Sequence, residues 1–238
     1  AGALAVASAK QRGLTVINHG AGTPPVGALA PYNGTRYSLL EDPPGAPAPQ
    51  TVAAHDGSKG AHGKLQFADH PEFCPMLTPA ECIRKGIFGG CYWNPRGGKP
   101  GIFGRDVAIS DAEFPAAWFE GVPEHMFKSR RYSVRTNCYG VKSGFGQKEW
   151  ESKGWIHDQD PRGWFQWYCR FFCGRRSHDD ARQIKRWCAC ASTRGRWRNQ
   201  LCGAVSKGSG RYADPAVSPV TRQTLLHWAY ELSEEDYG

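Results

Sequence analysis

The chain has 238 residues, of which 40% are hydrophobic and 22% are charged, and its formal net charge is +8. This length and apolar content are enough to bury a sizeable core within one domain. No segment approaches the roughly 18 consecutive apolar residues of a membrane span, and the Ala-rich start lacks the apolar centre of a signal peptide. The sequence therefore predicts a soluble protein that has no membrane partner.

Residues 1–63 are expected to form an extended, partly disordered arm. The stretch 20–63 is rich in Gly, Pro, Ala and small polar residues and has only brief apolar islands. From Leu65 the density of aromatic and aliphatic residues rises, and it stays high as far as Tyr230. We expect residues 64–238 to form one compact domain that is mainly α, with a small β or looped element.

A capping box marks the first helix expected in this domain. Residues 78–81 read Thr-Pro-Ala-Glu, and Gly86 is expected to end the helix. Between residues 86 and 104 the sequence Gly-Ile-Phe-Gly occurs twice, which we interpret as a hairpin-like or looped element whose Ile-Phe pairs enter the core. A last helix is predicted over residues 219–232.

Trp164, Trp167, Tyr168, Phe171 and Phe172 fall at helical spacing and predict an aromatic helix that Gly174 would end. One face of this helix needs burial, so its aromatic residues fit a core better than a ligand platform. Ser177 is expected to cap the following helix. Asp179 and Asp180 would then lie in its first turn, where the helix dipole favours negative charge.

The basic residues are concentrated in one segment. Residues 121–200 carry 17 Lys+Arg against 7 Asp+Glu, and they contain six of the nine tryptophans. Guanidinium groups and aromatic faces together bind polyanions and flat rings, whereas a solvated, salt-bridged helix face is the ordinary structural alternative. The arginines outnumber the nearby carboxylates, so we expect an anion-binding surface. Its expected residues are Arg170, Arg175, Arg176, Arg182, Lys185, Arg186, Trp187, Arg194, Arg196, Trp197 and Arg198.

The leading hypothesis is a nucleic-acid-binding domain, for DNA, RNA or another polyanion, and the sequence leaves open whether the domain also acts on its nucleic acid. Residues 192–198 suit a basic, aromatic loop that follows a phosphate backbone and stacks on a base. One alternative is an enzyme for a small anionic metabolite held in an arginine-lined pocket. Another is a scaffold that binds an acidic protein partner. The oligomeric state stays open.

A turn before Pro161 contains the candidate catalytic residues His157, Asp158 and Asp160. They could act as a general base or bind a hard cation, but acidic residues at this place are also ordinary turn and cap residues. The sequence contains neither a G-x-S-x-G nor an H-E-x-x-H motif. It therefore predicts no cofactor and no metal.

Nine cysteines, an odd number without a C-x-x-C pair, predict free thiols in a reducing, intracellular compartment. Nucleus and organelle are not distinguished. The alternative is a structural zinc site. Its candidate ligands are Cys169, Cys173, Cys188 and Cys190 or Cys202.

The segment GWIHDQDPRGWFQWYCRFFCGRR, followed by RQIKRW and later by RQTLLHWAY, resembles the signature of an uncharacterised family from plants, fungi and algae. The resemblance covers most of residues 70–232. It transfers no functional residues, and it implies that this span forms one domain.

Overall fold

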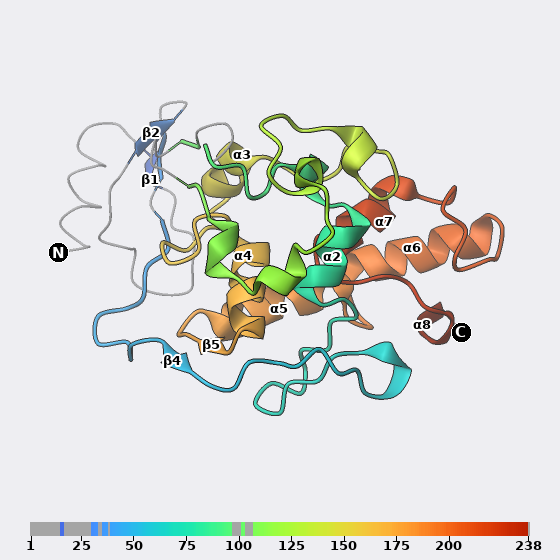
Figure 1. Cartoon of the computed structure of the whole chain (residues 1–238), viewed down its shortest axis with the longest axis horizontal. Coiled ribbons are helices and arrows are strands. Elements are labelled where there is room, and N and C mark those ends of the chain that lie inside the picture. Colours follow the sequence, from blue (N-terminus) through green and yellow to red (C-terminus); the bar gives the residue numbers. More distant parts are fainter. Residues whose placement is uncertain are drawn as a thin grey trace.

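The computed structural model describes residues 39–96, 101–102 and 107–237, and it gives the backbone of three short strands nearer the N-terminus. Over this part of the chain the protein is mainly helical, as the sequence predicts (Figure 1). The helices are α2 (Pro79–Lys85), α3 (Gln147–Ser152), α4 (Trp164–Phe172), α5 (Asp180–Ala191), α6 (Arg196–Lys207), α7 (Pro219–Leu226) and α8 (Glu234–Tyr237).

The strands are two or three residues long. β1 (Thr15–Val16) is parallel to β3 (Thr35–Tyr37), and β2 (Ala30–Tyr32) is antiparallel to β3. β4 (Gln50–Thr51) pairs antiparallel with β5 (Arg175–Arg176). Apart from β1, β2 and β3, the first 38 residues of the predicted arm lie outside the described residues, whereas residues 39–63 are described throughout.

We call residues 39–63 the strap, because this segment runs along the edge of the helical domain beside β5 (Figure 1). The Leu40 N–H donates to the carbonyl of Ile156, which precedes α4, over 3.2 Å. The Val52 N–H donates to the carbonyl of Gly174, which follows α4, over 2.9 Å. The strap is therefore hydrogen-bonded to the segment before α4 and to the segment after it.

Gly174→Ala tests this crossing, because Gly174 has φ +95° and a Cβ there would lie 2.2 Å from the carbonyl oxygen of Val52. We expect the substitution to lower the free energy of unfolding by about 3 kcal/mol in urea denaturation. Gly45→Ala is the matched control, since Gly45 has φ +83° but nothing within 4 Å of its Cβ position. It should cost only about 1 kcal/mol of backbone strain. Equal losses would contradict the tight crossing.

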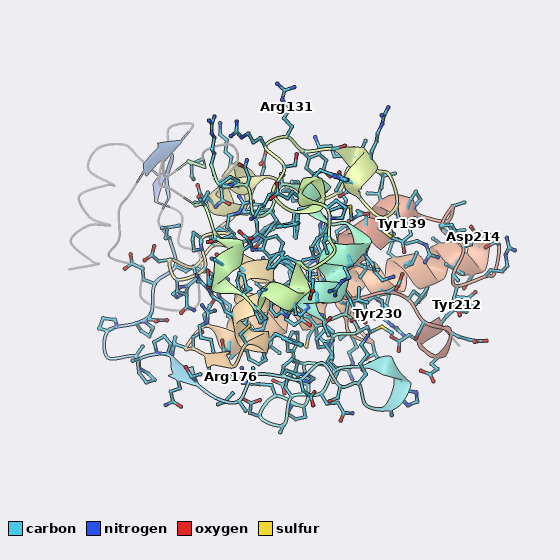
Figure 2. The ribbon with its side chains drawn as sticks, in the orientation of Figure 1. Arg131, Tyr139, Arg176, Tyr212, Asp214 and Tyr230 are labelled. Atoms are coloured by element: carbon cyan, nitrogen blue, oxygen red, sulfur yellow. The ribbon has the colours of Figure 1, made fainter. Side chains whose placement is uncertain are left out.

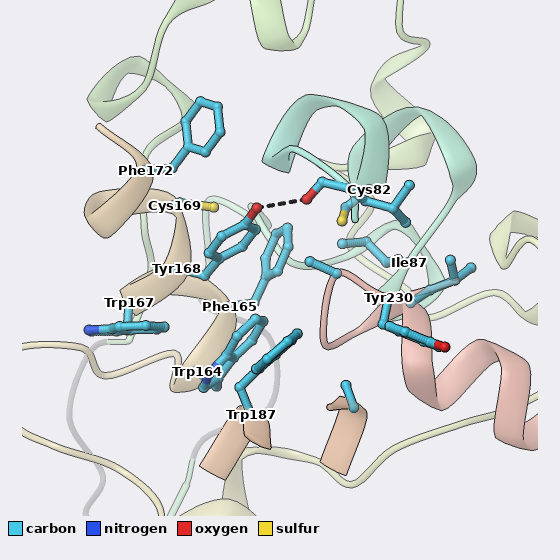
Figure 3. Packing of buried hydrophobic residues seen from close by; sticks show 14 of the residues in the cluster. Cys82, Ile87, Trp164, Phe165, Trp167, Tyr168, Cys169, Phe172, Trp187 and Tyr230 are labelled. Carbon is cyan, nitrogen blue, oxygen red and sulfur yellow. Dashed lines mark hydrogen bonds between the residues drawn. The ribbon is translucent and has the colours of Figure 1, made fainter. Parts of the chain in front are cut away.

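α4 is buried on every side, and Arg170 is its only partly exposed residue. The polar atoms of its aromatic side chains have partners. The Tyr168 hydroxyl donates to the Leu77 carbonyl over 2.7 Å (Figure 3), and the Trp167 indole donates to Asp180 over 2.8 Å. A helix that is apolar all round needs neighbours on all sides. α4 therefore forms the centre of the core.

The helix starts follow the predicted signals with one difference. Thr78 and Glu81 form the capping box, in which each side chain accepts the backbone N–H of the other residue. α5 begins at Asp180, and the N–H and hydroxyl of Ser177 both donate to the Asp180 carboxylate over 2.8 Å. A capping serine normally accepts a backbone N–H, but Ser177 donates its hydroxyl to the Asp180 carboxylate instead. The ionised carboxylate is a stronger acceptor than the serine hydroxyl.

α7 ends at Leu226, six residues before the predicted end. Ala229 has a left-handed backbone with φ +53°, and its carbonyl accepts the N–H groups of Met76 and Leu77 over 2.9 and 3.1 Å. This long-range pairing with the segment before α2 turns the chain out of the helix.

The two Gly-Ile-Phe-Gly segments belong to loops. Ile87 of the first is buried, and Phe88 opens a 3-10 turn over Phe88–Gly90. Ile102 of the second segment is partly buried, and Phe103 lies outside the described residues. The expectation that both pairs enter the core is thus met at Ile87 and stays a prediction for Phe103.

Candidate functional site

Several of the predicted anion-binding arginines form ion pairs with carboxylates that are distant in sequence. Arg176 binds Asp69, 107 residues away, beside the strap (Figure 2). Arg170 binds Glu113, 57 residues away, through Nε and Nη2. The sequence argument considered only nearby carboxylates. These contacts correct it, because folding brings the missing carboxylates to the arginines.

Asp160 is fully buried and holds two of these arginines together. Its carboxylate accepts Nη1 of Arg170 at 2.9 Å, and Nη1 and Nη2 of Arg175 at 2.8 and 2.6 Å. Within α5 and its cap, Arg182 binds both carboxylate oxygens of Asp179. The charges of these arginines are therefore already balanced inside the protein.

Asp160→Asn should lower the free energy of unfolding by about 3 kcal/mol, because it leaves two partly buried guanidinium groups without their shared counter-ion. Asp69→Asn removes a carboxylate whose side chain is 44% exposed, so it should cost at most about 1 kcal/mol. Urea denaturation of both variants measures the difference. A loss for Asp160→Asn no larger than that for Asp69→Asn would contradict this role.

The other two candidate catalytic residues lie on the same turn. His157 is buried, its Nδ1 accepts the Gln159 N–H over 3.3 Å, and its Nε2 lies 3.3 Å from the Asp42 carboxylate of the strap. Asp158 is exposed. The turn thus joins the strap to the arginine pairs. None of its three candidate residues lines the aromatic cavity among helices α3 to α7.

The predicted residues on α5 and α6 have different environments. Trp187 is 3% exposed and its indole donates to the Trp228 carbonyl over 2.9 Å, so it belongs to the core and not to a stacking surface. Arg198 donates to the carbonyls of Thr193 and Asp236. Two further predicted residues, Lys185 and Arg194, are exposed.

A cavity of about 290 Å³, which we call the tryptophan cavity, lies among α3, α4, α5, α6 and α7. Trp150 comes from α3, Trp164 from α4 and Trp197 from α6, while Trp155 and Trp228 follow α3 and α7. Its other aromatic lining residues are Phe88, Phe145, Phe165 and His227. Helices that are distant in sequence thus place flat aromatic faces around one space.

Arg162 lies against the Trp150 ring with its Cζ 6.0 Å from the centroid, and three further cations lie against the other rings. Lys153 Nζ is 5.7 Å from the centroid of the Trp155 ring, Arg186 Cζ is 5.6 Å from both Trp155 and Trp228, and Arg196 Cζ is 5.0 Å from Trp197. Within residues 39–96 and 107–237, none of the three has a carboxylate oxygen within 4.0 Å. Positive charge without a counter-ion therefore gathers at the tryptophan cavity.

Arg186 is the most enclosed of these cations. Its Nη1 donates to the Trp155 carbonyl over 3.2 Å and to the Gln183 side chain over 2.9 Å. Burial, together with the neighbouring Arg182, lowers the pKa of Arg186 to about 10, so the group stays protonated at neutral pH. A bound anion would stabilise this charge more than either neutral partner does.

A second, more open cavity of about 420 Å³ lies beside the strap and is lined by Arg170 and Arg175. Both arginines are held by Asp160, and Arg170 also binds Glu113. The tryptophan cavity is therefore the better candidate for an anion.

His227 ends α7 and lines the tryptophan cavity. Its ring stacks on Phe88 with the centroids 4.2 Å apart and the planes inclined by 13°. Burial lowers the pKa of His227 to about 3, so the imidazole is neutral at physiological pH. Sequence reasoning missed His227, Trp150, Trp155 and Lys153, because their spacing along the chain carries no signal of a common site.

The buried imidazole predicts a stability that depends on pH. The unfolded chain takes up a proton at His227 near pH 6.5 and the folded chain only near pH 3, so stability is complete above pH 6.5 and decreases as the pH falls. The decrease is at most about 1.4 kcal/mol per pH unit. Urea denaturation should show His227→Phe losing about 2 kcal/mol less than wild type between pH 7 and pH 5. Parallel losses in both proteins would contradict a buried neutral His227.

All nine cysteines lie in the described part of the chain and are free thiols, and Cys82 and Cys169 are fully buried. Across residues 39–96 and 107–237 there is no group of three or more His, Cys, Asp or Glu residues that could hold a metal ion. Nor does this part contain a helix whose length and apolar character would let it cross a membrane.

Comparison with protein-family models, with curated proteins and with solved structures finds no match to this chain. The resemblance to an uncharacterised family therefore stays a prediction.

Three of the predicted anion-binding residues line the tryptophan cavity, namely Arg186, Arg196 and Trp197.

Proposed function

We propose that the protein binds a small anionic molecule with a flat aromatic ring in the tryptophan cavity. The observation that carries this proposal is the distribution of charge. Four of the predicted arginines outside the cavity are paired with carboxylates, namely Arg170, Arg175, Arg176 and Arg182, whereas Lys153, Arg186 and Arg196 adjoin its tryptophans without one. The sequence offered as an alternative an enzyme that holds a small anionic metabolite in an arginine-lined pocket. We keep the binding of the anion and make no claim about a reaction.

The aromatic walls and the cations favour two parts of the same ligand. Indole and phenyl faces stack on a flat ring or contact its edge, and they exclude water from it. Aromatic cages also bind quaternary ammonium ions, but three protein cations around the cavity would repel such a ligand. The charge therefore favours an anion over a cation of equal shape.

Nucleic-acid binding is a second candidate, because Arg194 and Arg196 are exposed next to Trp197. A long polyanion gains affinity from many cations along its path. Four of the predicted arginines would add to the affinity for a polyanion only if they gave up their carboxylate partners. These are Arg170, Arg175, Arg176 and Arg182. A small ligand needs no such exchange, so we prefer it.

Quenching of tryptophan fluorescence by 2-naphthoate tests the proposal, with neutral 2-naphthamide as the ligand of matched shape. We expect 2-naphthoate to bind about tenfold more tightly than the amide, because its carboxylate gains a charge-assisted hydrogen bond to a guanidinium. Arg186→Gln should abolish this preference.

Lys185→Gln is the control variant, since Lys185 is an exposed cation of the same helix that does not line the cavity. It should keep the full preference for 2-naphthoate. Equal affinity of naphthoate and naphthamide for the wild-type protein would refute anion recognition. Tight, salt-sensitive binding of a short oligonucleotide with no binding of naphthoate would favour the nucleic-acid candidate instead.

A further inference from the structure

Residues 128–146, which we call the basic loop, carry positive charge without a carboxylate of their own. They include Lys128, Arg130, Arg131, Arg135 and Lys142 and contain no Asp or Glu. Lys128 is paired with Asp111 at 2.7 Å. The other four cations are exposed, and in the described stretches 39–96 and 107–237 none of them has a carboxylate oxygen within 4.0 Å. Their charge therefore faces solvent without a counter-ion.

The basic loop and the strap lie at opposite edges of the molecule in the view of Figure 1. Arg131 points away from the ribbon at the edge that the basic loop forms (Figure 2). The exposed cations are thus available to a partner that approaches from this side.

Exposed apolar side chains gather at the same place. Among the described residues five large hydrophobic side chains are exposed, and four of them belong to the basic loop or to the first turn of α7. They are Tyr132 at 41%, Val134 at 40%, Phe145 at 56% and Val220 at 52%. Single apolar side chains are ordinary on a protein surface, whereas a group of them marks an interaction site.

Hydrogen bonds join the basic loop to α7 and bring these side chains together. The Tyr132 hydroxyl accepts the Ser143 N–H over 3.4 Å. Ser143 Oγ lies 2.7 Å from the Thr224 hydroxyl and donates to the Val220 carbonyl over 3.4 Å. Phe145 follows Ser143 by two residues. Tyr132, Phe145 and Val220 therefore surround the same point of the surface.

The buried Asn137 fixes the shape of the basic loop. Its Nδ2 donates to the Tyr132 hydroxyl and to the Val141 carbonyl, each over 2.7 Å. Its Oδ1 accepts the Gly89 N–H, also over 2.7 Å. The basic loop is thus held in one arrangement, and Tyr132 is anchored by its polar end.

We propose that the basic loop binds the surface of a membrane that contains anionic phospholipids. Each cation near such a surface raises the partition coefficient about fivefold. Exposed apolar side chains add to this by entering the boundary between headgroups and acyl chains. Adsorption of this kind needs no spanning helix, so it differs from the membrane partner that the sequence predicts to be absent. It is also independent of the ligand of the tryptophan cavity.

The exposed side chains favour a membrane over other anionic partners. A single-stranded nucleic acid gains affinity from aromatic stacking, and Val134 and Val220 offer no aromatic face. A protein partner has to pack against the apolar side chains as closely as in a protein interior. Fluid lipid, in contrast, fits around separate apolar side chains.

Sedimentation of the full chain with lipid vesicles tests the proposal. Vesicles of phosphatidylcholine with about 30% phosphatidylserine should bind the wild-type protein more than about tenfold more tightly than vesicles of phosphatidylcholine alone. Added salt should weaken the binding, because it screens exposed charges.

The triple variant Arg130→Gln, Arg131→Gln, Arg135→Gln should lower the partition coefficient for the phosphatidylserine vesicles about 100-fold, since each lost cation costs about fivefold. The matched control is Lys185→Gln, Lys207→Gln, Arg211→Gln, which removes the same charge from exposed positions on α5 and at the end of α6. The control should bind these vesicles nearly as the wild-type protein does.

Phe145→Ser tests the apolar part of the surface. It should weaken binding to the phosphatidylserine vesicles about fivefold and leave the dependence on salt unchanged, because it removes apolar area and no charge.

The two kinds of vesicle can be compared on the wild-type protein, so the proposal is tested even if a variant does not fold. Equal binding to both vesicles, or no binding to either, would overturn it. Equal losses in the triple variant and its control would also overturn it, since net charge and not the basic loop would then govern binding. Binding of an oligonucleotide but of no vesicle, lost in the triple variant, would assign the basic loop to nucleic acid instead.

Discussion

The complete burial of α4 is the constraint on which the rest of the structure depends. Each indole and phenol of this helix brings a polar atom into the core, and each needs a partner there. Tyr168 takes the Leu77 carbonyl before α2, Trp167 takes Asp180 of α5, and Trp164 takes the Gln183 carbonyl of α5. These hydrogen bonds set where α2 and α5 pack, and the strap meets the end of α4, where the His55 N–H donates to the Phe172 carbonyl.

The same burial explains how the arginines are divided. Arg170 and Arg175 emerge at the end of α4, and the buried Asp160 holds both of them. Arg186 and Arg196 belong to α5 and α6, where tryptophans rather than carboxylates surround them. Charge is thus balanced around the end of α4 and left unbalanced at the tryptophan cavity, and Trp164 contributes to both the core and the cavity.

The sequence predicted most of the local features correctly. The capping box at residues 78–81 and the aromatic helix over residues 164–172 form as expected, because caps and helical spacing depend on neighbours within one or two turns. The end of α7 was predicted too late. Ala229 turns the chain there, and its carbonyl accepts the N–H groups of Met76 and Leu77. These residues lie about 150 positions earlier, so the sequence around residues 219–232 does not indicate the contact.

The sequence by itself determined that the domain is mainly helical, that one face of the aromatic helix needs burial, and that arginine and tryptophan gather in one segment. Only the tertiary structure decided which arginines are neutralised, that Trp187 belongs to the core, and that His227 and Trp150 share a cavity with Arg186. The physical reason is that Coulomb attraction and hydrogen bonding depend on distances in space. A carboxylate 107 residues away neutralises an arginine as fully as an adjacent one does.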